Sequence, residues 1–232
     1  MLKGCRAILL VIIGLALNTT LAAQAAPKSA VATQKVSGPT AEAIAKSGSF
    51  DGKLYTNELL GLTFLVPGGW NIFSDDQNRS ALAVGRENVK TGVSQKDDED
   101  LDKSMANTQI LFQATPFSFG TNAGGSVNSV LLSSGVERIH SKATSEKYLE
   151  VNKALVLHTP GTKITKDNYS VAFDGGSLAG FDVEGKTGGT AYRQSYLATV
   201  RKNVAVFFVI TYYDHKFDKI VPEALKTLRF RD

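Results

Sequence analysis

The chain has 232 residues, of which 43% are hydrophobic and 21% are charged, and its formal net charge is +4 at pH 7. An excess this small, carried by lysines dispersed along the chain, argues against nucleic acid as a partner, because nucleic-acid binding needs a clustered basic face. The one cysteine, Cys5, lies before an apolar run, in a segment that we expect to be removed. The remaining chain then has no disulfide, no thiolate metal ligand and no cysteine nucleophile.

Residues 1–25 have the three parts of a secretory signal peptide. Lys3 and Arg6 form a positive n-region, an apolar run follows over residues 7–17, and Ala23-Gln24-Ala25 supplies the small residues of a cleavage site. The alternative is an uncleaved membrane anchor, but the run is shorter than the roughly 18–20 apolar residues of a spanning helix. We therefore expect cleavage after this tripeptide, no stable membrane span afterwards, and a secreted or periplasmic protein.

The stretch that follows the signal differs in composition from the rest of the chain. Residues 26–49 are rich in Ala, Ser, Thr, Lys and Gly and contain almost no large apolar side chain. Such a stretch buries too little to offset the entropy cost of ordering, so we expect a flexible linker. The folded domain is expected to span residues 50–232, and about 180 residues are enough to bury one core without disulfides.

Alternation of apolar and polar residues predicts a domain built mainly from strands. The expected strands cover residues 53–56, 62–66, 80–87, 108–115, 126–133, 168–173, 178–184, 190–200 and 204–213. The last of them has apolar residues on both faces, including Phe207 and Phe208. A strand of this kind needs a packing layer above the sheet and another below it.

Two helices are expected to supply those layers. The first runs over residues 145–157, with Thr144 as its N-cap and Tyr148 on its apolar side. The second runs from about residue 214 to residue 228, and Pro222 inside it should either kink the helix or mark its first turn. The pattern therefore predicts an α+β fold arranged as a helix–sheet–helix sandwich.

One stretch resembles the opening hairpin of the PsbP-like proteins. It contains Tyr55-Thr56-Asn57, then a strand that begins with Gly61-Leu62-Thr63-Phe64, and then Pro67-Gly68-Gly69-Trp70. PsbP-like proteins carry a Tyr, a Gly-aromatic strand and a Pro-x-x-Trp in this order. The resemblance runs in order over residues 53–230. It implies an antiparallel β-sheet with helices packed on both faces, an α/β/α sandwich.

The same resemblance has consequences for function. Known PsbP-like proteins mostly bind or assemble other proteins, such as photosystem II or a small GTPase, and are not enzymes. This chain differs from them by a longer segment over residues 86–126, and the Pro-x-x-Trp motif is the only sharp one. No binding residue of the photosystem members can be matched here, so their specific role is not implied.

Residues 180–187 match the phosphate-loop pattern G-x-x-x-x-G-K-[ST]. Phosphate binding by this motif needs a loop that feeds a helix, whose N-terminal amides face the phosphates. Here Gly188-Gly189 and a further strand follow, and the segment itself contains Asp182 and Glu184, which would repel phosphate. We therefore expect a hairpin with Lys186 exposed on it, and neither a nucleotide nor another cofactor.

Asp98, Asp100 and Asp102 occupy alternate positions, as in the first half of a calcium-binding loop. That loop needs Gly at its sixth position and a bidentate acid at its twelfth, where this chain has Lys103 and Gln109. We expect a solvated acidic loop over Asp98–Asp102, with a weak cation site as the alternative.

The candidate nucleophiles and bases form no recognisable set. The histidines, His140, His158 and His215, are widely separated, and none lies in an H-E-x-x-H motif. We interpret them as surface or helix-end residues. Ser177 lacks the second glycine of a nucleophile elbow, and no helix follows it, so we interpret it as part of a turn.

Aromatic residues have two interpretations. Four tyrosines either line a binding face or serve as ordinary packing material on strands: Tyr192, Tyr196, Tyr212 and Tyr213. Trp70 is expected to anchor the core beside the Pro67 turn. We therefore assign no catalytic, cofactor-binding or metal-binding residue.

The leading hypothesis is an exported, non-enzymatic binding or assembly module of PsbP-like type, whose partner is another protein. It depends on the signal, on the resemblance and on the failure of each catalytic motif. One alternative is a hydrolase whose site is assembled from distant residues such as the three histidines. Another is a small-molecule carrier with a pocket between sheet and helix.

Overall fold

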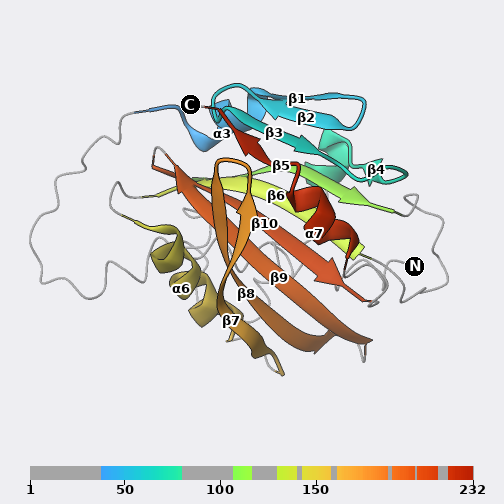
Figure 1. The fold of residues 1–232 in the computed structure, drawn as a ribbon, viewed down its shortest axis with the longest axis vertical. Coiled ribbons are helices and arrows are strands. Elements are labelled where there is room, and N and C mark those ends of the chain that lie inside the picture. Colours follow the sequence, from blue (N-terminus) through green and yellow to red (C-terminus); the bar gives the residue numbers. More distant parts are fainter. Residues whose placement is uncertain are drawn as a thin grey trace, which may run out of the picture.

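The computed structural model of the chain describes residues 38–79, 107–116, 130–139, 143–157, 161–187, 190–201, 203–213 and 219–231. Their strands form two antiparallel sheets (Figure 1). The larger sheet has the strand order β4 (Asn71–Ile72), β5 (Thr108–Thr115), β6 (Val130–Arg138), β10 (Val204–Tyr212), β9 (Thr190–Arg201), β8 (Gly176–Thr187) and β7 (Lys163–Phe173). The smaller sheet has the order β1 (Gly48–Asp51), β2 (Leu54–Asn57), β3 (Leu62–Leu65) and β11 (Arg229–Phe230).

The strand β10 lies at the centre of the larger sheet, and every residue of it is buried. It pairs with β6 on one side and with β9 on the other. Phe208 belongs to the core on one face of the sheet, and Phe207 belongs to the core on the other face. The prediction of a strand that is covered on both sides is therefore confirmed.

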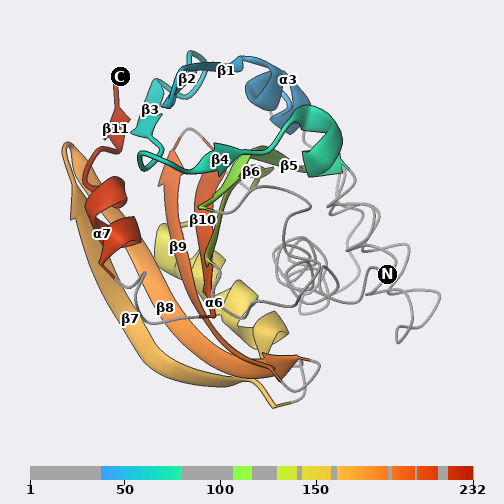
Figure 2. The same cartoon turned by 90° about the vertical axis from the view of Figure 1, so that its right-hand side faces the viewer.

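One face of the larger sheet is covered by the helix α6 (Ser145–Val156), which lies across β8 and β9 (Figures 1 and 2). Thr144 is its N-cap, because Thr144 Oγ1 accepts a hydrogen bond from Lys147 N at 3.3 Å. The helix buries Tyr148 and Leu149 against strand residues that include Phe181. The first predicted helix is confirmed in place and in orientation.

The other face of the larger sheet packs against the smaller sheet (Figure 2). The ring of Phe64 on β3 stacks on Phe112 of β5 at 5.4 Å and lies 5.8 Å from the ring of Phe208. At one side the two sheets are joined by a β-bridge between the backbones of Asp174 and Arg229. The side chains of the same two residues form an ion pair, with Arg229 Nε 2.8 Å from Asp174 Oδ2. The fold is α+β with helices on both faces, as predicted, and a second sheet that was not predicted forms part of one layer.

The helix α7 (Ile220–Leu225) packs into the same core through Val221 and Leu225. Pro222 is the third residue of this helix, a first-turn position whose N–H would have no partner within the helix. Of the two expectations for Pro222, the structure therefore supports the one in which it marks the first turn. Residues 214–218, where the helix was predicted to begin, lie outside the described residues.

The start of the folded domain differs from the prediction. Within residues 26–49, predicted to be a flexible linker, lies the helix α3 (Ala41–Lys46), followed at once by β1. Thr40 Oγ1 accepts a hydrogen bond from Ala43 N at 3.0 Å, and Ile44 is 1% exposed in the core that also contains Trp70. The helix contacts β1, β5 and β6, so it fills the opening between the two sheets. Ordered structure therefore begins before residue 50, because a short helix can bury Ala41 and Ile44 once a gap between the sheets accepts them.

The turn over Pro67-Gly68-Gly69-Trp70 shows why the Pro-x-x-Trp pattern folds as it does. Trp70 N donates a hydrogen bond to Pro67 O at 3.2 Å, and Gly69 has φ of 76°, a left-handed conformation that glycine adopts without strain. The turn delivers Trp70 into the core, where it is 3% exposed and its carbonyl accepts a hydrogen bond from Lys53 Nζ. The prediction that Trp70 anchors the core is confirmed.

Several strands extend beyond their predicted limits, β6 and β7 the furthest. β6 continues to Arg138, and β7 begins at Lys163. The pairing of β7 with β8 shifts register between Ile164 and Lys166 and again between Lys166 and Tyr169. These irregularities break the alternation of side chains, so the first half of β7 has no strand pattern in the sequence.

The predicted signal peptide at residues 1–25 lies outside the described residues, as do the strand predicted over residues 80–87 and residues 126–129 of another predicted strand. In the part of the chain that the structure describes, no helix has the length and the apolar content to cross a membrane.

Candidate functional site

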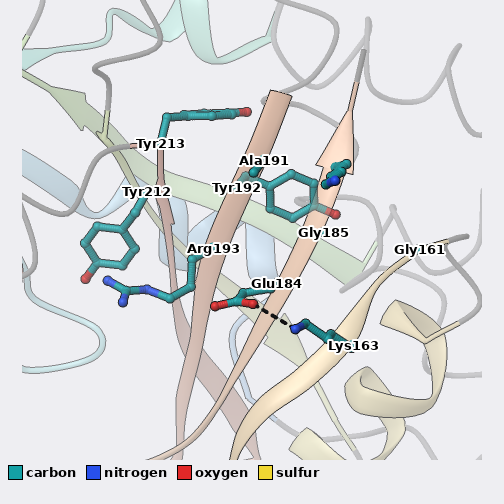
Figure 3. A pocket seen from close by; sticks show the side chains of 10 residues that line it. Gly161, Lys163, Glu184, Gly185, Ala191, Tyr192, Arg193, Tyr212 and Tyr213 are labelled. Atoms are coloured by element: carbon teal, nitrogen blue, oxygen red, sulfur yellow. Dashed lines mark ion pairs between the residues drawn. The ribbon is translucent and has the colours of Figure 1, made fainter. Parts of the chain in front are cut away.

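A groove of about 410 Å³ lies where four strands of the larger sheet end (Figure 3). It is lined by residues at the starts of β7 and β9 and at the ends of β8 and β10. The register places Lys163 opposite Glu184, Glu184 opposite Arg193, and Arg193 opposite Tyr212. Directly opposed residues of antiparallel strands share a face. These four side chains therefore form a row across the sheet, on the face that also carries Phe208.

Charge and ring contacts hold this row together. Lys163 Nζ lies 3.2 Å from Glu184 Oε2, and the guanidinium carbon of Arg193 lies 4.9 Å from the centre of the Tyr212 ring. Because the Lys163 side chain is 70% exposed, its ion pair contributes at most about 1 kcal/mol to stability. Lys186, exposed at the end of β8, forms no ion pair with any residue that the structure describes. The row therefore presents more positive than negative charge to the groove.

The other face of the same strand ends carries two tyrosines. Tyr192 lies over Gly185, where an added Cβ atom would be only 2.5 Å from the Tyr192 hydroxyl oxygen. The Tyr192 hydroxyl is 3.4 Å from Thr162 Oγ1, and its ring centre is 6.5 Å from that of Tyr213 in an edge-on arrangement. The absence of a side chain at residue 185 is thus what lets an aromatic ring lie against the sheet at this point.

The hydroxyl of Tyr213 is buried and has no hydrogen-bond partner among the residues of the described segments. Burial first, and the nearby Tyr192 second, raise the pKa of Tyr213, so this hydroxyl is a neutral donor. A buried polar group without a partner costs about 1–3 kcal/mol. A ligand that offered an acceptor at this edge of the groove would remove that cost.

The segment that matches the phosphate-loop pattern is part of this groove, but its conformation is that of a strand. Residues 180–187 lie in β8 and pair with β7 and β9, and Lys186 lies opposite Ala191. Backbone amides that pair within a sheet are not free to surround a phosphate. The predicted hairpin with an exposed Lys186 is confirmed.

The tyrosines divide between the two predicted roles. Tyr192, Tyr212 and Tyr213 line the groove, whereas Tyr196 is buried and stacks on Phe181 with ring centres 4.8 Å apart. Strand alternation separates them, and the sequence alone did not indicate which alternate positions would reach a groove. The sequence did not indicate Lys163, Glu184 and Arg193 as lining residues. Each is a charged residue near the end of a strand, and their proximity can be recognised only when the pairing of the strands is known.

Several residues considered from the sequence lie outside the described residues, namely Asp98, Asp100, Asp102, His140, His158 and His215. Ser177 is an exposed residue of β8, where it lies opposite Ala172, so its interpretation as part of a turn is wrong: the turn is at Gly175. Within the described segments, no group of three or more His, Cys, Asp or Glu side chains is placed to hold a metal ion.

A buried carboxyl group that the sequence did not reveal lies beneath α6. Glu137 on β6 is fully buried, and its Oε2 accepts a hydrogen bond from the Tyr148 hydroxyl at 3.0 Å. Its Oε1 has no partner among the described residues. Burial raises the pKa of Glu137 to about 8, although the hydrogen bond from Tyr148 acts in the opposite direction. The side chain does not line the groove, so we assign it to the core.

No family model matches the chain, and no curated protein matches it in sequence. Solved structures that are similar to it include cyanobacterial PsbP (CyanoP) from Synechocystis sp. PCC 6803, with 12% identity and a TM-score of 0.45 over 80% of this chain and 99% of that chain. LpqN of Mycobacterium tuberculosis, involved in cell envelope biogenesis, has 9% identity and a TM-score of 0.41 over 72% and 79%. PA94 of Pseudomonas aeruginosa, a protein of unknown function, has 15% identity and a TM-score of 0.42 over 54% and 83%.

Each of these TM-scores is below 0.5, so the likenesses carry no argument about function. Membership of the PsbP-like family stays a prediction, which rests on the hairpin of residues 55–70 and on the order of the elements that follow it.

Proposed function

We propose that this protein is an exported, non-enzymatic module that binds or assembles a protein partner through the groove at the ends of β7, β8, β9 and β10. The observation that carries the proposal is the lining of the groove, which combines Arg193 and Tyr212 from one face of the strand ends with Tyr192 and Tyr213 from the other. Tyrosine and arginine are enriched at the energetic centres of protein interfaces, because each combines a large contact area with a polar end. The export part of the proposal rests on the signal pattern of residues 1–25.

The geometry at the groove supports binding more readily than catalysis. Among the described residues that line the groove, Glu184 is the one carboxylate and is paired with Lys163, and none is Ser, Thr, Cys or His. The described part of the groove therefore offers no nucleophile with an adjacent base, which a hydrolase needs. A hydrolase that uses the three histidines remains the rival, and replacing all three by Ala separates the two proposals. Loss of the cellular phenotype with an unchanged melting temperature would favour the hydrolase.

The test of the binding function uses a photo-cross-linking amino acid at one position at a time in the full chain. With the cross-linker in place of Tyr192 we expect a discrete adduct, whose partner is identified by mass spectrometry and then shown to bind the purified protein. The matched control places the cross-linker at Glu42 on α3, which is exposed and lies at the far end of the molecule (Figure 2). Equal adducts at both positions, or none at either, would contradict the proposal.

Export is tested separately by N-terminal sequencing of the protein from the exported fraction. We expect the chain to begin at Ala26 or close to it. A full-length chain held in the membrane fraction would contradict cleavage of the signal.

A small-molecule carrier is the second candidate, and the size of the groove favours it, since about 410 Å³ lies within the usual range for ligand pockets. This groove lies at strand ends, whereas the place that the carrier hypothesis predicted, between sheet and helix, has a second hollow of about 420 Å³ between the end of β3 and α7. A native mass spectrum of the protein purified from its host would show a retained ligand if this alternative were correct.

A further inference from the structure

The face of the sheet that carries the row Lys163–Glu184–Arg193–Tyr212 is unevenly charged. By strand register and alternation, the part of this face nearest the groove bears four cationic side chains, Lys163, Lys166, Lys186 and Arg193, against two carboxylates, Asp182 and Glu184, while Arg138 and Arg201 share the face at the opposite strand ends. The net charge of this part of the sheet is therefore +2. The whole chain carries +4, and the expected mature chain carries +2 after Lys3 and Arg6 are removed.

Both carboxylates are already engaged within the protein. Asp182 Oδ1 accepts a hydrogen bond from the Tyr169 hydroxyl at 2.5 Å, and Glu184 Oε2 faces Lys163 at 3.2 Å. Lys166 Nζ lies over the Tyr169 ring, 4.2 Å from its centre. The negative charge of this face is thus directed at neighbouring residues, while Lys186 has no ion-pair partner in the described segments.

We infer that the groove takes an acidic, extended segment of a protein partner. This inference rests on the proposed function and adds the chemistry of the partner to it. Lys186 lies opposite Ala191, two residues before Arg193 on the adjacent strand, so the backbones of the two cations are roughly 8 Å apart. An extended peptide presents every second side chain on one face, at a spacing of about 7 Å. Two acidic side chains at alternate positions therefore match the two cations, and the Tyr212 ring lies beside the Arg193 cation on the same face.

Other anions fit this face less well. The amides of β8 are committed to pairing with β7 and β9, so an inorganic phosphate or a nucleotide phosphate finds no backbone cradle. A nucleic acid needs a larger and more uniform positive surface than four cations interrupted by two carboxylates. A peptide carries its charges on long side chains, which can reach past Glu184 to the cations on either side.

The experiment measures fluorescence anisotropy of a fluorescein-labelled decapeptide of alternating Glu and Thr, titrated with the mature protein. The matched probe replaces every Glu by Gln. We expect the Glu peptide to bind at least tenfold more tightly than the Gln peptide at low salt. We also expect Lys186→Gln and Arg193→Gln each to lower the affinity for the Glu peptide threefold or more. Lys147→Gln, an exposed change on α6, should leave the affinity unchanged. Thermal unfolding of each variant shows that the fold is retained.

Two results would overturn the inference. One is equal binding of the Glu and Gln peptides, or of the parent protein and both groove variants. The other is tighter binding of a labelled oligonucleotide of ten thymidines than of the Glu peptide, which would show a general polyanion site. If the cross-linker at position 192 gives an adduct in the cell but the Glu and Gln peptides bind equally, the partner is not acidic, and the proposal of a binding module is retained. Absence of that adduct rejects the binding module whatever the peptides do.

Discussion

Phe207 and Phe208 are neighbours on β10, but they enter cores of different character. Phe208 lies between the two sheets in an aromatic core that also contains Phe64 and Phe112. On the face of Phe207 the sheet buries polar groups as well: Gln194 Nε2 donates to Thr211 Oγ1 at 3.0 Å, Gln113 Nε2 donates to Ser133 Oγ at 2.9 Å, and Glu137 accepts from Tyr148.

The difference teaches how one sheet can be stabilised in two ways. The aromatic core depends on shape and on area removed from water, so its response to mutation follows the volume that is lost. The mixed core depends in addition on hydrogen bonds that must stay satisfied. Buried oxygens of Glu137, Asn152 and Gln113 have no partner among the described residues, and neither has Ser134 Oγ, which lies opposite Phe208 in the aromatic core. Among the described residues Glu137 is the one buried carboxyl group, and it lies in the mixed core. We therefore expect the mixed core to respond to pH, and the aromatic core not to do so.

The largest expected effect is that of Phe208→Ala. Removing a buried Phe side chain costs about 3–5 kcal/mol, out of a total stability of about 5–15 kcal/mol for an ordinary domain. The ring is fully buried and makes an aromatic contact across the sheets, so the melting temperature should fall sharply or the protein should fail to accumulate. Phe207→Ala is the matched change, and urea unfolding should show a smaller loss for it, because polar groups nearby can bind water in the vacated space. A larger loss for Phe207→Ala would remove the distinction between the cores.

The next effect concerns α3, which completes the aromatic core. Ile44→Ala should lower the free energy of unfolding by about 2–3 kcal/mol, at the lower end for buried Ile because a terminal helix can partly relax. Urea unfolding measures it. Glu42→Ala on the exposed side of the same helix removes only a surface pair with Lys46 and should leave the free energy of unfolding unchanged within error. If Ile44→Ala were as stable as the parent, residues 41–46 would behave as the flexible linker that the sequence predicted.

Glu137→Gln tests the mixed core through its pH dependence. Because burial raises the pKa of Glu137 to about 8, the folded protein retains a proton that the unfolded chain has released between about pH 4.5 and pH 8. The contribution of Glu137 to stability is therefore fully present below pH 4.5 and is lost as the pH rises towards 8, with a slope that approaches about 1.4 kcal/mol per pH unit. Glutamine keeps the shape without the charge, so the variant should lose this slope and exceed the parent in stability at pH 8. Urea unfolding at four pH values between 5 and 8 gives the comparison, and parallel curves would contradict it.

The smallest expected effect lies outside both cores. Lys186→Ala should change the free energy of unfolding by less than about 0.5 kcal/mol, because the residue is exposed at a strand end. ATP should raise the melting temperature of neither the parent nor the variant. A stabilisation by ATP that disappears in the variant would show that residues 180–187 bind phosphate after all.

Local patterns were enough to predict most elements of this protein. The nine residues of β10 read as a strand because apolar side chains occupy both of its faces, and α6 reads as a helix because Thr144 caps it and Tyr148 lies on its apolar side. Pro67 and Trp70 marked a turn and a core anchor, because the backbone of that turn needs glycine at residue 69. These features depend on residues only a few positions apart, so they can be recognised in the sequence.

Tertiary structure alone decided the rest. Ala41 and Ile44 are core residues only because two sheets leave an opening of the right size, and Glu137 is neutral only because α6 lies over it. The groove exists because the register of four strands places Lys163 beside Glu184 and Arg193 beside Tyr212, so that residues 49 positions apart in the sequence lie in one row. Strand register is set by packing over the whole sheet, and a shift of one residue would turn each of these side chains to the opposite face.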